Sequence, residues 1–101
     1  MGITKFSEYL HNELQNDQEA KAYINVALEE FFIDNNKEMF LVAIKNVIDA
    51  QGGISHISRK AKLNRQHLYK MLSAKGNPSF DNIGALLSAL GLKLKVEQNH
   101  I

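Results

Sequence analysis

The stretch Gly53–Leu72, GISHISRKAKLNRQHLYKML, decides how the chain is expected to fold. Its apolar residues recur at helical spacing over 54–61 and again over 64–72. Asn64 is a favourable N-cap for the second helix, and Leu63 and Leu68 stand at the two positions of a hydrophobic staple. Two short helices separated by a tight turn predict a helix-turn-helix. The positions expected to face inward are Ile57, Leu63, Leu68 and Leu72.

The outer face of the second helix has the chemistry of a base-reading surface. Arg65 can donate two hydrogen bonds to guanine, and Gln66 can pair in the same way with adenine. Lysine and asparagine side chains nearby are suited to phosphates, which set register without reading sequence. The residues expected to contact DNA are Ser55, Asn64, Arg65, Gln66, His67, Tyr69, Lys70, Lys75 and Asn77.

The charge of the chain is divided between its two halves. Residues 1–51 hold four Lys/Arg and nine Asp/Glu, a net charge of −5, whereas residues 52–101 hold eight and two, a net charge of +6. Asp49 and Asp81 are separated by a stretch with six basic residues and no acidic one. This asymmetry favours a polyanionic partner for the second half, although a solvated basic face is an equal alternative on charge alone.

Length and composition indicate one ordinary globular domain, 1–101. The 101 residues are 45% hydrophobic and 23% charged and include no cysteine, which excludes disulfides and thiolate or zinc-finger chemistry. The start lacks a secretory signal pattern and no apolar run is long enough to span a bilayer, so the cytoplasm is the expected location. The four histidines have no metal-ligand spacing, and no nucleophile–base set can be assembled, so we expect neither metal, nor cofactor, nor enzymatic activity.

Helical stripes on both sides of the central stretch predict an all-α bundle. Residues 1–36 read as an extension of two helices, and 37–91 as the core that holds the helix-turn-helix. Asn35 and Glu38 have capping-box spacing at the start of the core. Met71 is a further expected core position within the central stretch. Those outside it are Phe6, Tyr9, Leu10, Leu14, Ala20, Tyr23, Ile24, Ala27, Leu28, Phe31, Phe40, Ala43, Ile44, Val47, Ile48, Ile83, Leu86, Leu87 and Leu90.

The last segment, 92–97, alternates apolar and charged residues, which is typical of a half-buried strand. Nothing else in the chain reads as a strand, and one strand cannot satisfy its own backbone groups. We therefore expect it to pair with the same strand of a second copy in a dimer. A helix extension or a frayed tail is the alternative.

Residues 38–91 resemble the lambda-repressor-like (XRE) helix-turn-helix family. The resemblance lies in Gly53–Leu72 and in Asn77-Pro78-Ser79-Phe80, which is similar to the family's turn into its fourth helix. Two positions depart from the usual pattern: Ser58 stands where alanine is common, and Lys62 where glycine makes the turn. A left-handed backbone at Lys62 would cost about 1 kcal/mol.

The resemblance is closer to the prophage-type addiction-module antidote proteins, and it covers nearly the whole chain. It is carried by FSEYL at 6–10, AYINVALEE at 22–30, LYKML at 68–72, GNPSF at 76–80 and ALGLKL at 89–94. It implies an antitoxin that neutralises a small basic toxin of the RelE/HigB kind and represses its own operon. The acidic half suits a cationic toxin, with Glu8, Glu13, Glu29, Glu30 and Asp34 as candidate contacts.

Two other functions remain open from the sequence. A prophage transcriptional regulator without a toxin needs the same DNA-binding half, so sequence cannot separate it from an antitoxin. In a protein-binding module the basic residues would serve solubility only. The salt dependence of binding to any duplex distinguishes that module from a DNA-binding protein, because phosphate contacts release counterions.

Overall fold

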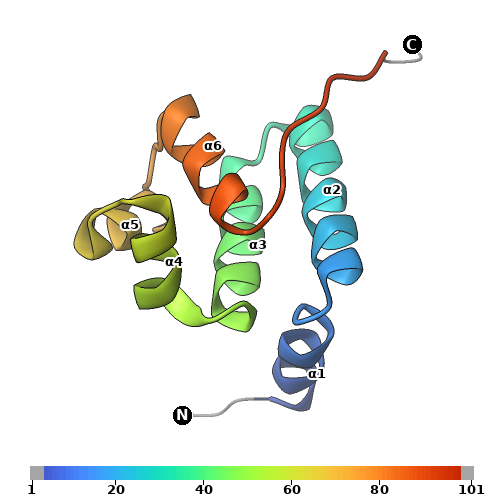
Figure 1. Cartoon of the computed structure of the whole chain (residues 1–101). Coiled ribbons are helices and arrows are strands. Elements are labelled where there is room, and N and C mark those ends of the chain that lie inside the picture. Colours follow the sequence, from blue (N-terminus) through green and yellow to red (C-terminus); the bar gives the residue numbers. More distant parts are fainter. Residues whose placement is uncertain (1–3, 99–101) are drawn as a thin grey trace.

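The fold is all-helical, as the apolar stripes predict. The computed structural model describes residues 4–98 and contains six helices within them (Figure 1). They are α1 (Lys5–Glu13), α2 (Asp17–Asp34), α3 (Lys37–Ala50), α4 (Gly53–Ala61), α5 (Arg65–Met71) and α6 (Phe80–Ala89).

Polar caps fix where the helices begin. The side chain of Asn16 accepts from two backbone N–H groups at the start of α2, and Asn64 and Ser79 cap α5 and α6. The predicted capping box does not form, because α3 begins one residue later than expected and Met39 then stands at the third helical position. Asn36 is the N-cap of α3, whereas Asn35 ends α2 with φ 58°, a left-handed conformation that asparagine tolerates.

The core is built around α3. Ile44, Val47 and Ile48 are fully buried there, and α3 packs against α1, α2 and α4. α6 completes the core by packing on α4 and burying Leu86 and Leu87. Most of the expected core positions are confirmed as buried or half-buried in this cluster.

The apolar stripe predicted on α1 is only half correct. Leu14, just after the helix, is buried and Leu10 packs against the core, but Phe6 and Tyr9 are 70% and 62% exposed. The reason is that α1 meets the rest of the bundle through its C-terminal end, close to the bottom of α3 (Figure 1). Two of the four expected core residues therefore lie on the surface.

Apolar side chains of both α4 and α5 fix the turn between these helices to the core. Ile57 of α4 and Leu68 of α5 are buried, and half-buried Leu63 packs against the same cluster. Ser58 is also buried, and its hydroxyl donates to the carbonyl oxygen of Ser55 at 3.0 Å. The serine therefore replaces the more common alanine without leaving an unsatisfied polar group.

Lys62 adopts the left-handed backbone that glycine usually takes in this turn, with φ 58° and ψ 41°. Its side chain is exposed. Replacing it by glycine should relieve the Cβ strain, although glycine also gains entropy in the unfolded chain. We expect Lys62→Gly to raise the free energy of unfolding by up to about 1 kcal/mol in urea titration. Lys60→Gly, inside helix α4, should lower it, and a loss of stability in both variants would contradict the strain.

The predicted C-terminal strand is absent. Residues 92–98 have no regular secondary structure, and no strand occurs anywhere in 4–98. Only Leu92 is half-buried, with its N–H donating to the carbonyl oxygen of Leu87 at 2.7 Å, whereas Leu94 and Val96 are exposed. The physical reason is that a single chain offers no second strand for the backbone groups of this segment.

Candidate nucleic-acid interface

The outer face of α5 is the candidate nucleic-acid interface. Leu68 and Met71 point into the core, so the rest of this short helix faces solvent. The exposed residues are Arg65, Gln66, His67, Tyr69 and Lys70. All five were predicted at this surface, and the structure brings them together on one helix.

Arg65 lies over the ring of Tyr69, with its Cζ 5.9 Å from the ring centroid. An arginine in this position is attracted by the face of the aromatic ring. The contact limits the rotamers of Arg65 and keeps its guanidinium on the exposed side of α5. The two residues therefore act as a pair, with Tyr69 positioning Arg65.

Asn64 has a structural role at the tip of the interface. Its Oδ1 accepts from the backbone N–H of His67 at 3.0 Å, which leaves the side-chain NH₂ free to donate. Asn64, Gln66, His67 and Lys70 line a shallow hollow of about 380 Å³ on this surface. The hollow is open to solvent, and the four polar side chains around it offer hydrogen-bond donors and acceptors to a ligand.

The other predicted contact residues lie around this helix. Lys75 is exposed in the segment between α5 and α6, and half-buried Ser55 lies in the first turn of α4. Asn77 is exposed, but its Oδ1 accepts from Lys37 Nζ at 3.2 Å and so links this segment to the start of α3. Ser55 and Lys75 lie in the segments before and after α5, whereas the side-chain oxygen of Asn77 already accepts a hydrogen bond from Lys37.

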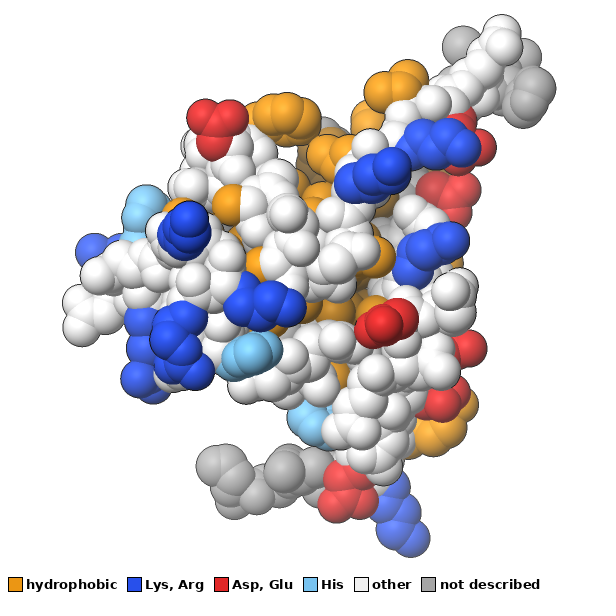
Figure 2. Space-filling view, viewed as in Figure 1, with side chains coloured by type: hydrophobic (Ala, Val, Ile, Leu, Met, Phe, Trp, Pro, Cys, Tyr) orange, Lys and Arg blue, Asp and Glu red, His pale blue; other side chains and the backbone are white. Residues whose placement is uncertain are grey.

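Basic side chains collect on the side of the molecule formed by α4 and α5. Figure 2 shows a group of Lys and Arg side chains over this region, and further basic side chains along the C-terminal segment and the α2 side. All six are exposed, and the ion pair found within residues 4–98 is Lys45–Asp49, which involves none of them. The six residues are Arg59, Lys60, Lys62, Arg65, Lys70 and Lys75. An uncompensated basic surface of this kind raises the local concentration of polyanions.

The acidic candidates divide between two helices. Glu29, Glu30 and Asp34 are exposed on the C-terminal half of α2, whereas Glu8 and the half-buried Glu13 belong to α1. α2 lies on the opposite side of the molecule from α5 (Figure 1). The structure therefore does not bring all five together, and it separates them from the basic surface.

The exposed face of α2 also carries apolar residues that the sequence reasoning missed. Val26 and Ile33 are 54% and 84% exposed and lie opposite the buried Ile24. Their spacing places them on one stripe with Glu29 and Glu30. The sequence does contain a signal for them, because Val26 and Ile33 are apolar residues outside the stripe that was assigned to the core.

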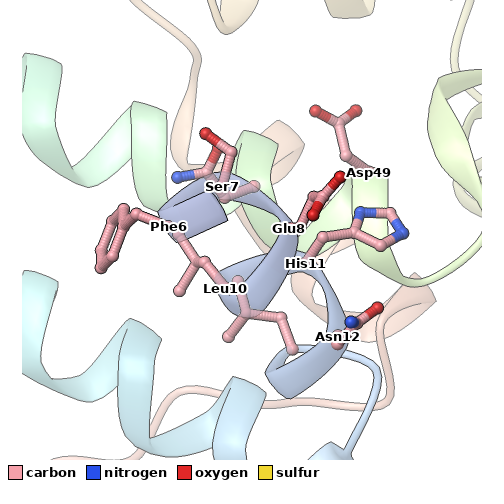
Figure 3. Close-up of a pocket in the computed structure, with 9 residues that line it drawn as sticks. Phe6, Ser7, Glu8, Leu10, His11, Asn12 and Asp49 are labelled. Carbon is pink, nitrogen blue, oxygen red and sulfur yellow. The ribbon is translucent and has the colours of Figure 1, made fainter. Parts of the chain in front are cut away.

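A hollow of about 700 Å³ lies between α1 and α3. Figure 3 shows Glu8, His11 and Asp49 beside it, on the side of α1 that faces away from Phe6. Elsewhere on α1, the hydroxyl of Tyr9 donates to Glu13 Oε1 at 3.3 Å, and the nearby carboxylate raises the pKa of Tyr9. Within residues 4–98 no group of three or more His, Asp and Glu side chains is arranged to hold a metal ion. None of these helices is long and apolar enough to cross a membrane.

Comparison with known proteins identifies the family. The family model described as "Probable addiction module antidote protein" matches residues 3–98. The chain belongs to this family. An antidote implies a toxin partner, and the family is not one of known enzymes.

One relative of this antidote is a protein of Haemophilus influenzae strain Rd, described as an uncharacterized protein. It is 35% identical over 86 residues, which cover 85% of this chain and 84% of that protein. No solved structure matches the chain. The family is therefore identified from sequence similarity. The arrangement of the chain in space is that of the six helices described above.

Proposed function

We propose that this antidote is a sequence-specific DNA-binding antitoxin of a type II toxin–antitoxin module that represses its own operon. In this proposal α4 and α5 form a lambda-repressor-like (XRE) helix-turn-helix, and α5 enters the major groove. The observation that carries the proposal is the outer face of α5. It combines exposed Arg65, Gln66 and Lys70 on a helix whose opposite face is held by Leu68.

The side-chain chemistry assigns different roles in DNA binding to different residues of the helix-turn-helix. Arg65 and Gln66 are the residues suited to bidentate contacts with guanine and adenine edges. Lys70 and Lys75 contribute positive charge for phosphates, which positions the protein without reading sequence. Ser55, Asn64, His67, Tyr69 and Asn77 complete the proposed surface.

The experiment is fluorescence anisotropy with a duplex from the region directly upstream of the gene that encodes this chain. A scrambled duplex of equal length and composition is the matched control. We expect tighter binding to the upstream duplex and a steep loss of affinity between about 50 and 200 mM salt. Equal binding to both duplexes would contradict the base-reading role, and no binding at 50 mM salt would overturn DNA binding altogether.

We propose further that the toxin is a small basic protein of the RelE/HigB type and that it binds the acidic face of α2. Val26 and Ile33 supply apolar contacts on this face, and Glu29, Glu30 and Asp34 supply negative charge. A helix with an apolar stripe and charged flanks is suited to binding in a groove of a partner protein. Because α2 lies opposite α5, the antitoxin can hold toxin and DNA at the same time.

Reversing two charges on this face should weaken neutralisation. We expect Glu29→Lys with Glu30→Lys to reduce affinity for the toxin of the same module about tenfold, because like charges are then opposed. The measurement is titration of the purified toxin, together with growth after co-expression. Glu97→Lys is the control, since it changes an exposed carboxylate outside α1 and α2. A greater loss from Glu8→Lys with Glu13→Lys would move the site to α1.

The alternative function is that of a prophage transcriptional regulator without a toxin partner. The exposed basic face of α5 supports it equally. If duplex binding is sequence-specific and no protein encoded beside this gene arrests growth when expressed alone, this alternative is the better account.

A further inference from the structure

An unusual concentration of exposed apolar side chains lies at one end of the bundle. Phe32, Phe80 and Val96 are 79%, 77% and 96% exposed, and Leu94 is 43% exposed. They come from the end of α2, the start of α6 and the C-terminal segment, which Figure 1 places at the same end of the molecule. Figure 2 shows hydrophobic side chains there, between α6 and the C-terminal segment. We call these four residues the apolar end.

Among residues 4–98, the four side chains of the apolar end stay exposed to solvent. Phe32 meets Phe31 edge to face, with ring centroids 5.7 Å apart, and the remainder of its ring is open to solvent. Within 92–98, Leu92 is the residue that packs against the core cluster, whereas Leu94 and Val96 are exposed. Exposed large apolar groups concentrated in one place are typical of an interaction surface.

The charges around the apolar end have both signs. Lys93 and Lys95 flank Leu94, whereas Asp34 and Asp81 adjoin Phe32 and Phe80. A surface that meets its own copy across a two-fold axis must complement itself, and therefore needs both signs in one patch. The outer face of α2 lacks this property, because Glu29 and Glu30 would oppose each other across such an axis. The charge pattern favours a second copy at the apolar end and a different, basic partner at α2.

The position of the apolar end also suits a dimer on DNA. It lies to one side of the α4–α5 surface (Figure 1), so a two-fold axis through it can leave both α5 helices facing the same way. The molecule measures 43 × 31 × 25 Å, so equivalent helices in two adjoining copies can lie about one molecular width apart. That separation is of the order of the 34 Å between successive major grooves on one face of a duplex.

We infer that the apolar end is the homodimer interface of this antitoxin. This inference rests on the proposed function only in the spacing of half-sites; the exposure and charge pattern stand without it. A standard interface takes roughly 800 Å² from each copy, about a tenth of the 7511 Å² surface of the chain. The second copy covers the rings of Phe32 and Phe80 and the side chains of Leu94 and Val96.

The test is sedimentation equilibrium of the full chain, with Phe80→Asp and Val96→Asp combined in one variant. Both side chains are exposed, and Asp is well tolerated at the first position of a helix, so the fold should survive. Val26→Asp on the outer face of α2 is the matched control, and circular dichroism confirms that the variants are helical. We expect a dimer for the wild type and the control, and at least a tenfold increase in the dimer dissociation constant for the double variant.

A wild-type chain that stays monomeric at tens of micromolar would overturn the inference, as would a dimer that the double variant leaves intact. A dimer lost in Val26→Asp alone would place the interface on α2 and also overturn it. Failure of this inference is distinguishable from failure of the proposed function. A monomer that binds the upstream duplex contradicts only the interface, and a dimer that binds no duplex contradicts only DNA binding.

Discussion

Replacing Arg65 by alanine is expected to weaken binding to the upstream duplex by about 1–3 kcal/mol while leaving binding to the scrambled duplex nearly unchanged. The physical reason is that a bidentate contact to guanine is lost only where the correct base is present. Arg65 is exposed and lies over the ring of the exposed Tyr69, so its removal leaves the core intact. The measurement is fluorescence anisotropy with both duplexes at one fixed salt concentration.

The matched variant is Lys70→Ala, which lies on the same helix and removes the same charge. A lysine that contacts phosphate contributes equally on every sequence, so both duplexes should be bound more weakly. The slope of log K against log salt should fall by about one. If Arg65→Ala and Lys70→Ala behave alike on the two duplexes, Arg65 does not read bases.

The helices of this chain could be predicted because the signals that define them are local. The spacing of Phe40, Ile44 and Val47 marks the buried side of α3, and single polar residues such as Asn64 and Ser79 mark helix starts. These signals can be recognised without knowing which helices pack against each other. Their accuracy at the turn before α5 is the reason that the candidate interface could be assigned to one helix from sequence.

The errors come from contacts between distant parts of the chain. Phe6 and Tyr9 have helical spacing with Leu10, but whether they are buried depends on how far α1 extends over α3. The strand predicted at 92–97 needs a partner that the single chain does not contain. Asn77 looks free in sequence, yet Lys37, forty positions away, donates to it. Local patterns carry no information on these long-range relations.

The candidate interface was also only partly predictable. Residue types on α5 indicate its chemistry, but the position of Arg65 over the ring of Tyr69 is known only from the coordinates. On α2, charge alone selected Glu29 and Glu30 and overlooked Val26 and Ile33, which lie before and after them on the same exposed stripe. An interface on a helix combines apolar anchors with charges, so the charged half alone gave an incomplete description.

Leu68→Ala is expected to produce the largest loss of stability, about 2–5 kcal/mol in the free energy of unfolding. Leu68 is fully buried and is one of two α5 residues, with Met71, that anchor the helix to the core. A helix of seven residues is not stable by itself in water, so its position depends on these contacts. Urea titration followed by circular dichroism measures the loss.

Tyr69→Ala is the matched control, because it removes a large side chain from the next position on the exposed side of the same helix. It should change the free energy of unfolding by less than about 1 kcal/mol, since surface substitutions rarely do more. It should instead weaken binding to the upstream duplex, because Arg65 loses the ring that positions it. Substitutions at these two neighbouring residues therefore separate the effect on stability from the effect on DNA recognition. A loss of stability below about 1 kcal/mol for Leu68→Ala would mean that α5 is held by other contacts.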